Sequence, residues 1–166
     1  MRSKGRYSSG ISQRSPASSA ELAAELARLG LRVGDTVMVH ASLRAVGPVE
    51  GGADGVIDAL EAAVGRHGTL LMTLGARDDH SWVNERPEVE RGPLLARAEP
   101  FDALVTPAQP DVGYLAEAFR RREGTRVTDH PEGRFGARGA RALELIEKHR
   151  GTTTTAPTRR STACAA

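Results

Sequence analysis

The sequence has little cysteine and no long apolar run. Its 166 residues include one cysteine, Cys164, which excludes an internal disulfide and a metal cluster held by several cysteines. No apolar stretch approaches the roughly 18 residues that a membrane-spanning helix needs. The length is sufficient for one domain with a single core. We therefore expect a cytoplasmic protein with no membrane-embedded part.

Acidic residues are missing from both ends of the chain. Residues 1–20 carry four basic side chains and residues 152–166 carry two, with no acid in either stretch. Because the formal net charge is +2, the region between these ends has a net charge of −4. The pI of about 9.1 would normally indicate a nucleic-acid partner, but these basic residues form no structured patch. No nucleic-acid partner is predicted, and the acidic body suits a small polycation better.

Hydrophobic content predicts one folded domain between two polar ends. Residues 1–17 have too little hydrophobicity to order themselves and are predicted to form a disordered arm. Their Ser- and Arg-rich composition superficially resembles a transit peptide, but clear amphipathic order is lacking. Residues 18–150 are the predicted domain, and residues 151–166 are a second disordered segment.

The domain begins with a helix pattern followed by a strand pattern. Ser18 and Glu21 form a capping box before a short amphipathic helix, which Gly30 ends. The run Thr36-Val37-Met38-Val39 is short, β-branched and apolar on both faces. It predicts a strand that is parallel to its neighbours and internal to a covered sheet.

The pattern then repeats, which indicates an α/β fold. A helix with one apolar stripe is predicted between Gly52 and Gly65, and residues 69–73 predict a second buried strand. Two strands joined by such a helix form a βαβ unit. A third helix is predicted from Val112, and a fourth at about residues 140–148.

A turn of small residues follows the first strand, between His40 and Gly47. In an open α/β sheet, ligands bind outside the carboxyl ends of the strands. Such a turn can present backbone N–H groups and the Ser42 hydroxyl to a phosphate or an amide. Taken alone, it also fits an ordinary connection between a strand and a helix, with His40 as a core histidine bonded to backbone.

Residues 75–109 show no periodicity and contain four prolines, and a fifth follows at position 110. An irregular segment of this length is uncommon in a compact domain and is often functional. It is rich in acids, although a solvated loop would explain them equally well. Asp78 and Asp79 beside His80 resemble metal ligands, but no second histidine or carboxylate stands at a helical spacing to complete a site. No metal is predicted.

A second constrained turn surrounds His130 in the stretch RVTDHPEGRFGARG, residues 126–139. Its glycines and Pro131 forbid a long helix, and a residue before proline is restricted to extended geometry, which helps to aim the imidazole. A surface histidine in a turn is the alternative interpretation.

Five blocks of the sequence, in order, resemble the aminoglycoside N3-acetyltransferase family, and the match runs from about Glu21 to His149. They are MVHASLRAVG at 38–47, GGADGVIDALEAAVGRHGTLLMTL at 51–74, PFD at 100–102, VGYLAEAFR at 112–120 and RVTDHPEGRFGARG at 126–139. Any one block alone would be weak. The resemblance implies a layered α/β/α sandwich with a mostly parallel sheet, incomplete at its C-terminus.

The resemblance also implies substrates and site residues. The donor would be acetyl-coenzyme A, with its pantetheine arm along the first turn, and the acceptor an amino group of an aminoglycoside antibiotic. The implied cofactor-lining positions are His40, Ala41, Ser42, Leu43, Gly47 and Thr73. The acidic loop residues Asp78, Asp79 and Asp102 are the predicted partners of the substrate's ammonium groups. Two positions depart from the family pattern, which more often has a hydroxyl residue at Ala41 and serine at Arg134.

Acetyl transfer to an amine needs a base, because an amine is mostly protonated at neutral pH. A histidine titrates near neutrality, so His130 is predicted to be the general base. An acidic neighbour usually orients such a ring, and Asp129 and Glu132 are the local candidates. The alternative hypothesis is an α/β module that binds coenzyme A without turnover.

The resemblance ends near Arg150, where a patterned helix gives way to a threonine run and then to PTRRSTACAA. Family members continue through further strands and helices. The change looks like a shifted reading frame, with a natural polar tail as the alternative. A sheet that lacked its usual cover would expose more apolar surface than a soluble monomer tolerates. The expectation is a poorly soluble chain with little or no activity.

Overall fold

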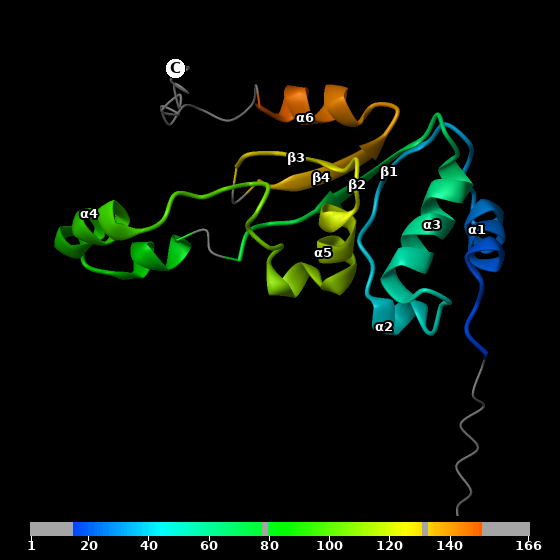
Figure 1. Cartoon of the computed structure of the whole chain (residues 1–166), viewed down its shortest axis with the longest axis horizontal. Helices are drawn as coiled ribbons and strands as arrows, with labels where there is room; N and C mark the ends of the chain where they lie inside the picture. Colours follow the sequence, from blue (N-terminus) through cyan, green and yellow to red (C-terminus); the bar gives the residue numbers. More distant parts are fainter. Residues whose placement is uncertain (1–14, 78–79, 131–132, 151–166) are drawn as a thin grey trace, which may run out of the picture.

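The computed structural model describes residues 15–77, 80–130 and 133–150. They form one four-stranded sheet with helices on both faces (Figure 1). The predicted α/β class and layered arrangement are confirmed. Ala17, assigned from the sequence to the N-terminal arm, forms a bridge with Val49. None of the helices in these residues is long and apolar enough to cross a membrane.

The sheet is mixed, in the order β1-β2-β4-β3. Its strands are β1 (Thr36–Met38), β2 (Thr69–Thr73), β3 (Arg126–Val127) and β4 (Phe135–Gly139). β1 and β2 are parallel, whereas β4 pairs antiparallel with both β2 and β3. The prediction of a mostly parallel sheet is therefore wrong for the described residues, because the antiparallel β4 occupies the place beside β2.

The first strand is also not internal, as its sequence predicts, but lies at the edge of the sheet. Val37 faces the core, whereas the Met38 side chain is 44% exposed. The run is apolar in composition, but its burial alternates along β1, with Val37 half-buried and Thr36 and Met38 exposed. Composition alone did not distinguish this alternation from burial on both sides.

The sequence does not predict strand β4, because its glycines are typical of turns. A Cβ at Gly136 would lie 3.1 Å from the ring of Phe119. Gly139 has a φ of +119°, and a Cβ there would lie 2.2 Å from the carbonyl oxygen of Gly68. Close packing therefore requires both glycines inside the strand, which the sequence pattern does not reveal.

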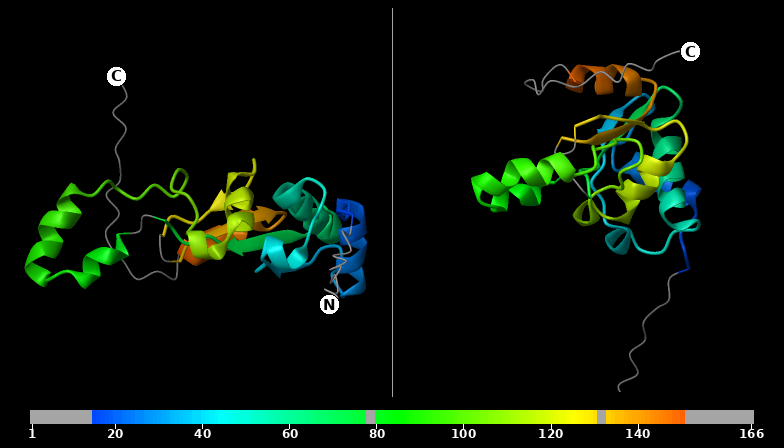
Figure 2. Two further views of the ribbon diagram at one scale, coloured as in Figure 1. Left: turned by 90° about the horizontal axis from the view of Figure 1, so that it is seen from below. Right: turned by 60° about the vertical axis from the view of Figure 1, so that its left-hand side comes forward.

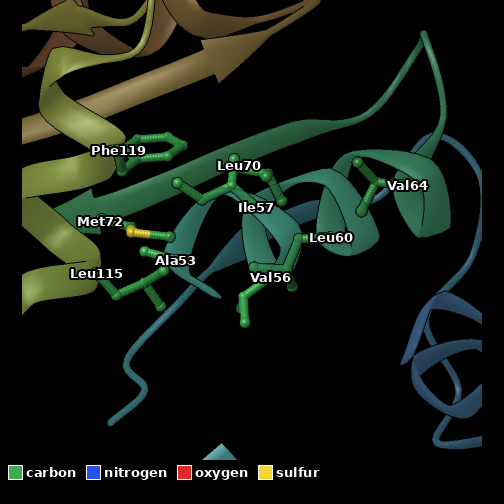
Figure 3. Packing of buried hydrophobic residues seen from close by; sticks show 9 residues of the cluster. All are labelled: Ala53, Val56, Ile57, Leu60, Val64, Leu70, Met72, Leu115 and Phe119. Atoms are coloured by element: carbon green, nitrogen blue, oxygen red, sulfur yellow. The ribbon is translucent and has the colours of Figure 1, made fainter. Parts of the chain in front are cut away.

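The main core lies between the sheet and two helices on one face, α3 (Gly52–Val64) and α5 (Tyr114–Arg121). Figure 3 shows the packing of its buried side chains, which are Ala53, Val56, Ile57, Leu60, Val64, Leu70, Met72, Leu115 and Phe119. α1 (Ser19–Arg28) packs on the outside of α3, and the predicted capping box of Ser18 and Glu21 is confirmed.

The opposite face of the sheet is covered by α6 (Ala142–Arg150), which lies above the strands in Figure 1. Ala142 and Ile146 pack against Ala137 of β4 and Leu71 of β2. This contact completes the third layer and places the last described residues beside β3 and β4.

Residues 75–109 contain more structure than the sequence predicts. They include a short 3-10 helix, η1 (Ser81–Glu85), and α4 (Glu88–Arg97), while a second 3-10 helix, η2 (Pro110–Val112), precedes α5. α4 has no buried residue and carries Pro93 inside it. It packs mainly against η1, and the pair projects away from the sheet (Figures 1 and 2). A helix without a buried face leaves no apolar periodicity to recognise.

Candidate functional site

A cavity of about 600 Å³ opens at the carboxyl ends of β1 and β2. Three segments form it: residues 39–44 after β1, the end of β2, and residues 111–116 at the start of α5. The short helix α2 (Leu43–Val46) begins in the first of these segments. This location is where open α/β sheets bind ligands.

Five of the six residues predicted to line a cofactor do line this cavity. They are His40, Ala41, Ser42, Leu43 and Thr73. The sixth, Gly47, caps the C-terminal end of α2 with a φ of +90°, and its N–H donates to the Leu43 carbonyl. Gly47 therefore shapes the turn, because its backbone conformation is one that other residues rarely adopt. Contact of these residues with a cofactor stays a prediction.

The opposite wall of the cavity was not foreseen. It includes Asp111, Gly113 and Tyr114, where the chain enters α5. Asp111 and Tyr114 are exposed and polar, so this wall offers hydrogen-bonding groups to an occupant. The sequence marked the segment only as the beginning of a helix.

The histidine turn lies beside the same end of the sheet. Phe135, which follows the turn, pairs with Thr73 of the cavity wall. Thr128 closes the turn, because its N–H donates to the Phe135 carbonyl over 3.0 Å and its hydroxyl accepts from the Phe135 N–H over 2.8 Å. The two turns singled out from the sequence, ninety residues apart, therefore lie at the same end of the sheet, although His130 is not among the residues that line the cavity.

His130 is half-buried and held by backbone. The N–H of Gly133 donates to His130 Nδ1 over 3.1 Å. Gly133 is held in turn by His149 of α6, whose Nε2 lies 2.8 Å from the Gly133 carbonyl oxygen. The His149 ring meets Phe135 edge-on, with centroids 5.1 Å apart. His149 is thus part of the turn, although the sequence indicated only that it ends a helix.

The predicted acidic partners occupy different positions. Asp129 lies in the turn and is exposed, and Glu132 falls outside the described residues. The His130 nitrogen that an acid would bind accepts from the Gly133 amide instead. The roles of Asp129 and Glu132 stay predictions.

Of the three predicted substrate-binding acids, only Asp102 can be placed, because Asp78 and Asp79 lie outside the described residues. Asp102 is exposed, and its Oδ1 accepts from the N–H groups of Leu104 and Val105 over 2.8 and 3.2 Å. These bonds fix its carboxylate at the start of residues 101–109, which we call the anchored segment.

Arg134 holds the anchored segment to the histidine turn. Its side chain is fully buried, and its guanidinium donates to the carbonyls of Gly75 and Pro107 over 3.2 Å each, and to that of Ala103. It also lies over the Phe101 ring, 5.6 Å from the centroid. Burial, with a smaller contribution from Arg120, lowers the pKa of Arg134 to about 10, so the group stays charged at neutral pH.

The family departure at Arg134 is therefore a structural anchor. Its Nε is buried without a hydrogen-bond partner among the described residues. No sequence pattern indicated that this arginine would be interior, since arginine is rarely fully buried.

The anchored segment is tied to α5 as well. Glu117 accepts from the Ala108 N–H over 2.8 Å and forms a bidentate pair with Arg120. Arg120 also donates to the Leu104 carbonyl over 2.6 Å. The Arg120 hydrogen bond is the largest of the effects that lower the pKa of Glu117 below its usual 4.5.

The described residues show no arrangement of three or more His, Cys, Asp or Glu side chains that could hold a metal ion. The polar side chains that line the cavity include those of His40, Ser42, Thr73, Asp111 and Tyr114. They suit an organic ligand with carbonyl or amine groups.

These features define an α/β domain with a ligand cavity and a histidine turn at the carboxyl ends of its strands. The family model for aminoglycoside 3-N-acetyltransferases matches residues 38–161. The chain belongs to this family, as its sequence blocks indicated.

Individual relatives agree. Aminoglycoside N(3)-acetyltransferase III of Serratia marcescens is 42% identical over 131 residues, which are 78% of this chain and 48% of the relative. The crystal structure of aminoglycoside acetyltransferase AAC(3)-Xa is 39% identical with a TM-score of 0.75, covering 81% of this chain and 47% of that one. A structure of AAC-IIIb in binary complex with CoASH is 35% identical with a TM-score of 0.70, covering 81% and 50%. The chain spans about half the length of the curated relatives it matches.

Proposed function

We propose that the protein transfers the acetyl group of acetyl-coenzyme A to an amino group of an aminoglycoside. The observation that carries the proposal is the cavity at the ends of β1 and β2, whose wall is the family's first sequence block and whose neighbour is the histidine turn. The relative with bound CoASH supports the choice of cofactor. In the proposed complex, the pantetheine arm lies along residues 40–43.

His130 is the proposed proton-handling residue. Acetyl transfer removes a proton from the attacking amine and supplies one to the departing thiolate, and one imidazole can do both in turn. Backbone N–H groups of the first turn are the proposed donors to the thioester oxygen as it becomes negative. Asp129 and Glu132 are the proposed candidates for orienting the imidazole during the transfer.

The proposed acceptor is a polycation, in agreement with the acidic body of the chain. Asp102 presents its carboxylate from the anchored segment, and Asp78 and Asp79 precede the projecting helices in sequence. Exposed charges attract a polycation more strongly at low salt. Replacing Asp102 with Asn should therefore raise the aminoglycoside KM most at low ionic strength.

The first test is thiol release from acetyl-coenzyme A with a panel of aminoglycosides. His130→Gln should lower turnover by roughly 100-fold or more while coenzyme A binding stays unchanged. His67→Gln is the matched control, because His67 lies before the amino end of β2, away from the cavity. Coenzyme A binding without thiol release would support the non-catalytic module instead.

Substitutions at two alanines, one inside the cavity and one outside it, test whether the cavity binds coenzyme A. Ala41→Trp should fill the cavity and weaken coenzyme A binding, because Ala41 lines it. Ala45→Trp on α2 is the matched control, since Ala45 is exposed and is not a lining residue. Equal loss of binding in both variants would remove the cavity from the proposal.

A further inference from the structure

Helix α4 gains little support from the rest of the described chain. None of its ten residues is buried, and it packs mainly against η1 in the projecting region (Figure 2). Its interior contains Gly92 and Pro93, the two residue types with the lowest helix propensity. Isolated helices shorter than about 12–15 residues are marginal in water, and most helices in proteins are stabilised by packing of one face. A partner for α4 is therefore expected outside the single copy.

One face of α4 is apolar and exposed. Successive residues of a helix are about 100° apart, so four residues of α4 fall within an arc of about 100°. They are Val89, Gly92, Pro93 and Ala96, which we call the α4 face. All four are exposed, and Val89 is 84% exposed. A Cβ placed on Gly92 would meet nothing within 4 Å, so the space in front of this face is open in one copy.

The charges beside the α4 face are arranged in a self-complementary order. The first turn of α4 is acidic and includes Glu90, whereas the last turn is basic and contains Arg97. Both side chains are exposed and border the same side of the face. They are seven residues apart, and ion pairs within a helix join residues only three or four positions apart. Each charge is therefore placed for a partner on another helix.

We propose that the α4 face binds a second copy of this chain, with the two α4 helices antiparallel about a two-fold axis. In a two-fold interface the same patch contacts itself, so each contact occurs twice. With the axis near Gly92 and Pro93, Val89 of each copy lies against Ala96 of the other. The same axis places Glu90 of each copy opposite Arg97 of the other.

The charge order of α4 favours a second copy over another partner. An antiparallel helix of the same sequence presents a basic end to the acidic end of α4 and an acidic end to its basic end. A partner with charge of only one sign would meet a like charge at one end. Gly92 also lets the two backbones approach closely, because the distance between packed helices depends on the side chains at the contact.

The size of the interface predicts its strength. Two helices of ten residues are too short to bury the roughly 1,200–2,000 Å² of a stable complex. We therefore expect a weak dimer whose population rises with protein concentration. At low concentration α4 stays exposed, as it is in one copy.

Sedimentation of the full chain over a series of concentrations measures the association. The unchanged protein should shift from monomer toward dimer as its concentration rises. Gly92→Gln should remove the dimer across the series, because the new side chain has open space in one copy but would separate two packed helices. Ala27→Gln is the matched control, since Ala27 is a small exposed residue of α1, and it should dimerise like the unchanged protein.

Exchanged charges test the antiparallel pairing. Glu90→Arg or Arg97→Glu alone places like charges opposite each other twice, and should weaken dimerisation roughly tenfold. An equal mixture of the two variants should associate again, because one copy then has two basic side chains at these positions and the other has two acidic ones. Salt should weaken the association of the mixture, since the paired charges are exposed.

A chain that stays monomeric at every concentration would overturn the proposal, and so would normal dimerisation of Gly92→Gln. Failure of the mixture to associate better than its two components would do the same, because antiparallel α4 helices require that rescue. Non-specific aggregation gives no such rescue and also counts against the proposal. These measurements involve no acetyl transfer, so they are independent of the proposed function.

Discussion

Helices α4 and α5 have similar lengths and flank the anchored segment, yet they differ in how much of their surface is buried. α5 buries Leu115, Ala116 and Phe119, whereas α4 has no buried residue. The bonds that hold the anchored segment come from α5, from Arg134 just before β4 and from the exit of β2. The anchored segment is therefore held by elements that pack on the core, whereas α4 contributes exposed surface and does not hold the segment in place.

The largest effect that this comparison predicts comes from the core side of α5. Phe119 is fully buried against Gly136 and the main core. Phe119→Ala should destabilise the protein by about 3–5 kcal/mol, because it leaves a cavity that close neighbours cannot fill. Denaturant unfolding measures the change.

The matched substitution in α4 is Leu95→Ala, at a side chain that is 51% exposed. It should change the free energy of unfolding by less than about 0.5 kcal/mol. Similar losses in the two variants would show that α4 is packed against a partner in solution and would break the comparison.

A second, smaller effect concerns the anchored segment. Arg134→Met removes donors from three carbonyls, those of Gly75, Ala103 and Pro107. Leaving the buried Gly75 carbonyl without this donor costs about 1–3 kcal/mol, so we expect a loss of this size. Amide exchange should rise first at Arg77, whose N–H donates to the Pro107 carbonyl.

Two controls sharpen this prediction. Arg134→Lys should restore little, because a single ammonium group cannot reproduce the fork of a guanidinium. Arg126→Met, at an exposed position of β3, should leave Arg77 exchange unchanged. Full protection of the segment in Arg134→Met would mean that α5 and the backbone bonds to the exit of β2 hold it without Arg134.

The same contrast explains what the sequence could predict of the fold. Local patterns predicted the ends of two helices correctly. They are the capping box of Ser18 and Glu21 in α1 and the glycines at the ends of α3. The sequence of α4 shows no apolar periodicity, because none of its residues is buried. The sequence of β4 resembles a turn, because close contacts with Phe119 and Gly68 require glycines in this strand. The edge position of β1 depends on which strand pairs with β2, and a local pattern does not contain that information.

For the candidate site, the sequence identified the residues on turns and missed those that support them. His40–Leu43 and Thr73, which the resemblance implied as cofactor-lining positions, line the cavity, and their contact with a cofactor stays a prediction. The Asp111–Tyr114 wall, the Arg134 anchor and the His149 contact arise from contacts between distant elements. Their residue types form no recognisable sequence motif, so these contacts can be identified only in the folded structure.

The smallest predicted effect is the response of the anchored segment to acid. Arg120 lowers the pKa of Glu117 below 4.5 in the folded chain, so protonation of Glu117 favours the unfolded form. The stabilisation is present above this pH and is lost as the pH falls through the lowered pKa. The Ala108 N–H donates directly to Glu117, so its chemical shift should follow that titration with a midpoint below 4.5. In Glu117→Gln the shift should stay flat over the same range, because no carboxylate remains to titrate. A midpoint at or above 4.5 would show that the Arg120 pair does not hold this carboxylate in solution, and the anchored segment would then depend on Arg134 and on the backbone bonds to the exit of β2.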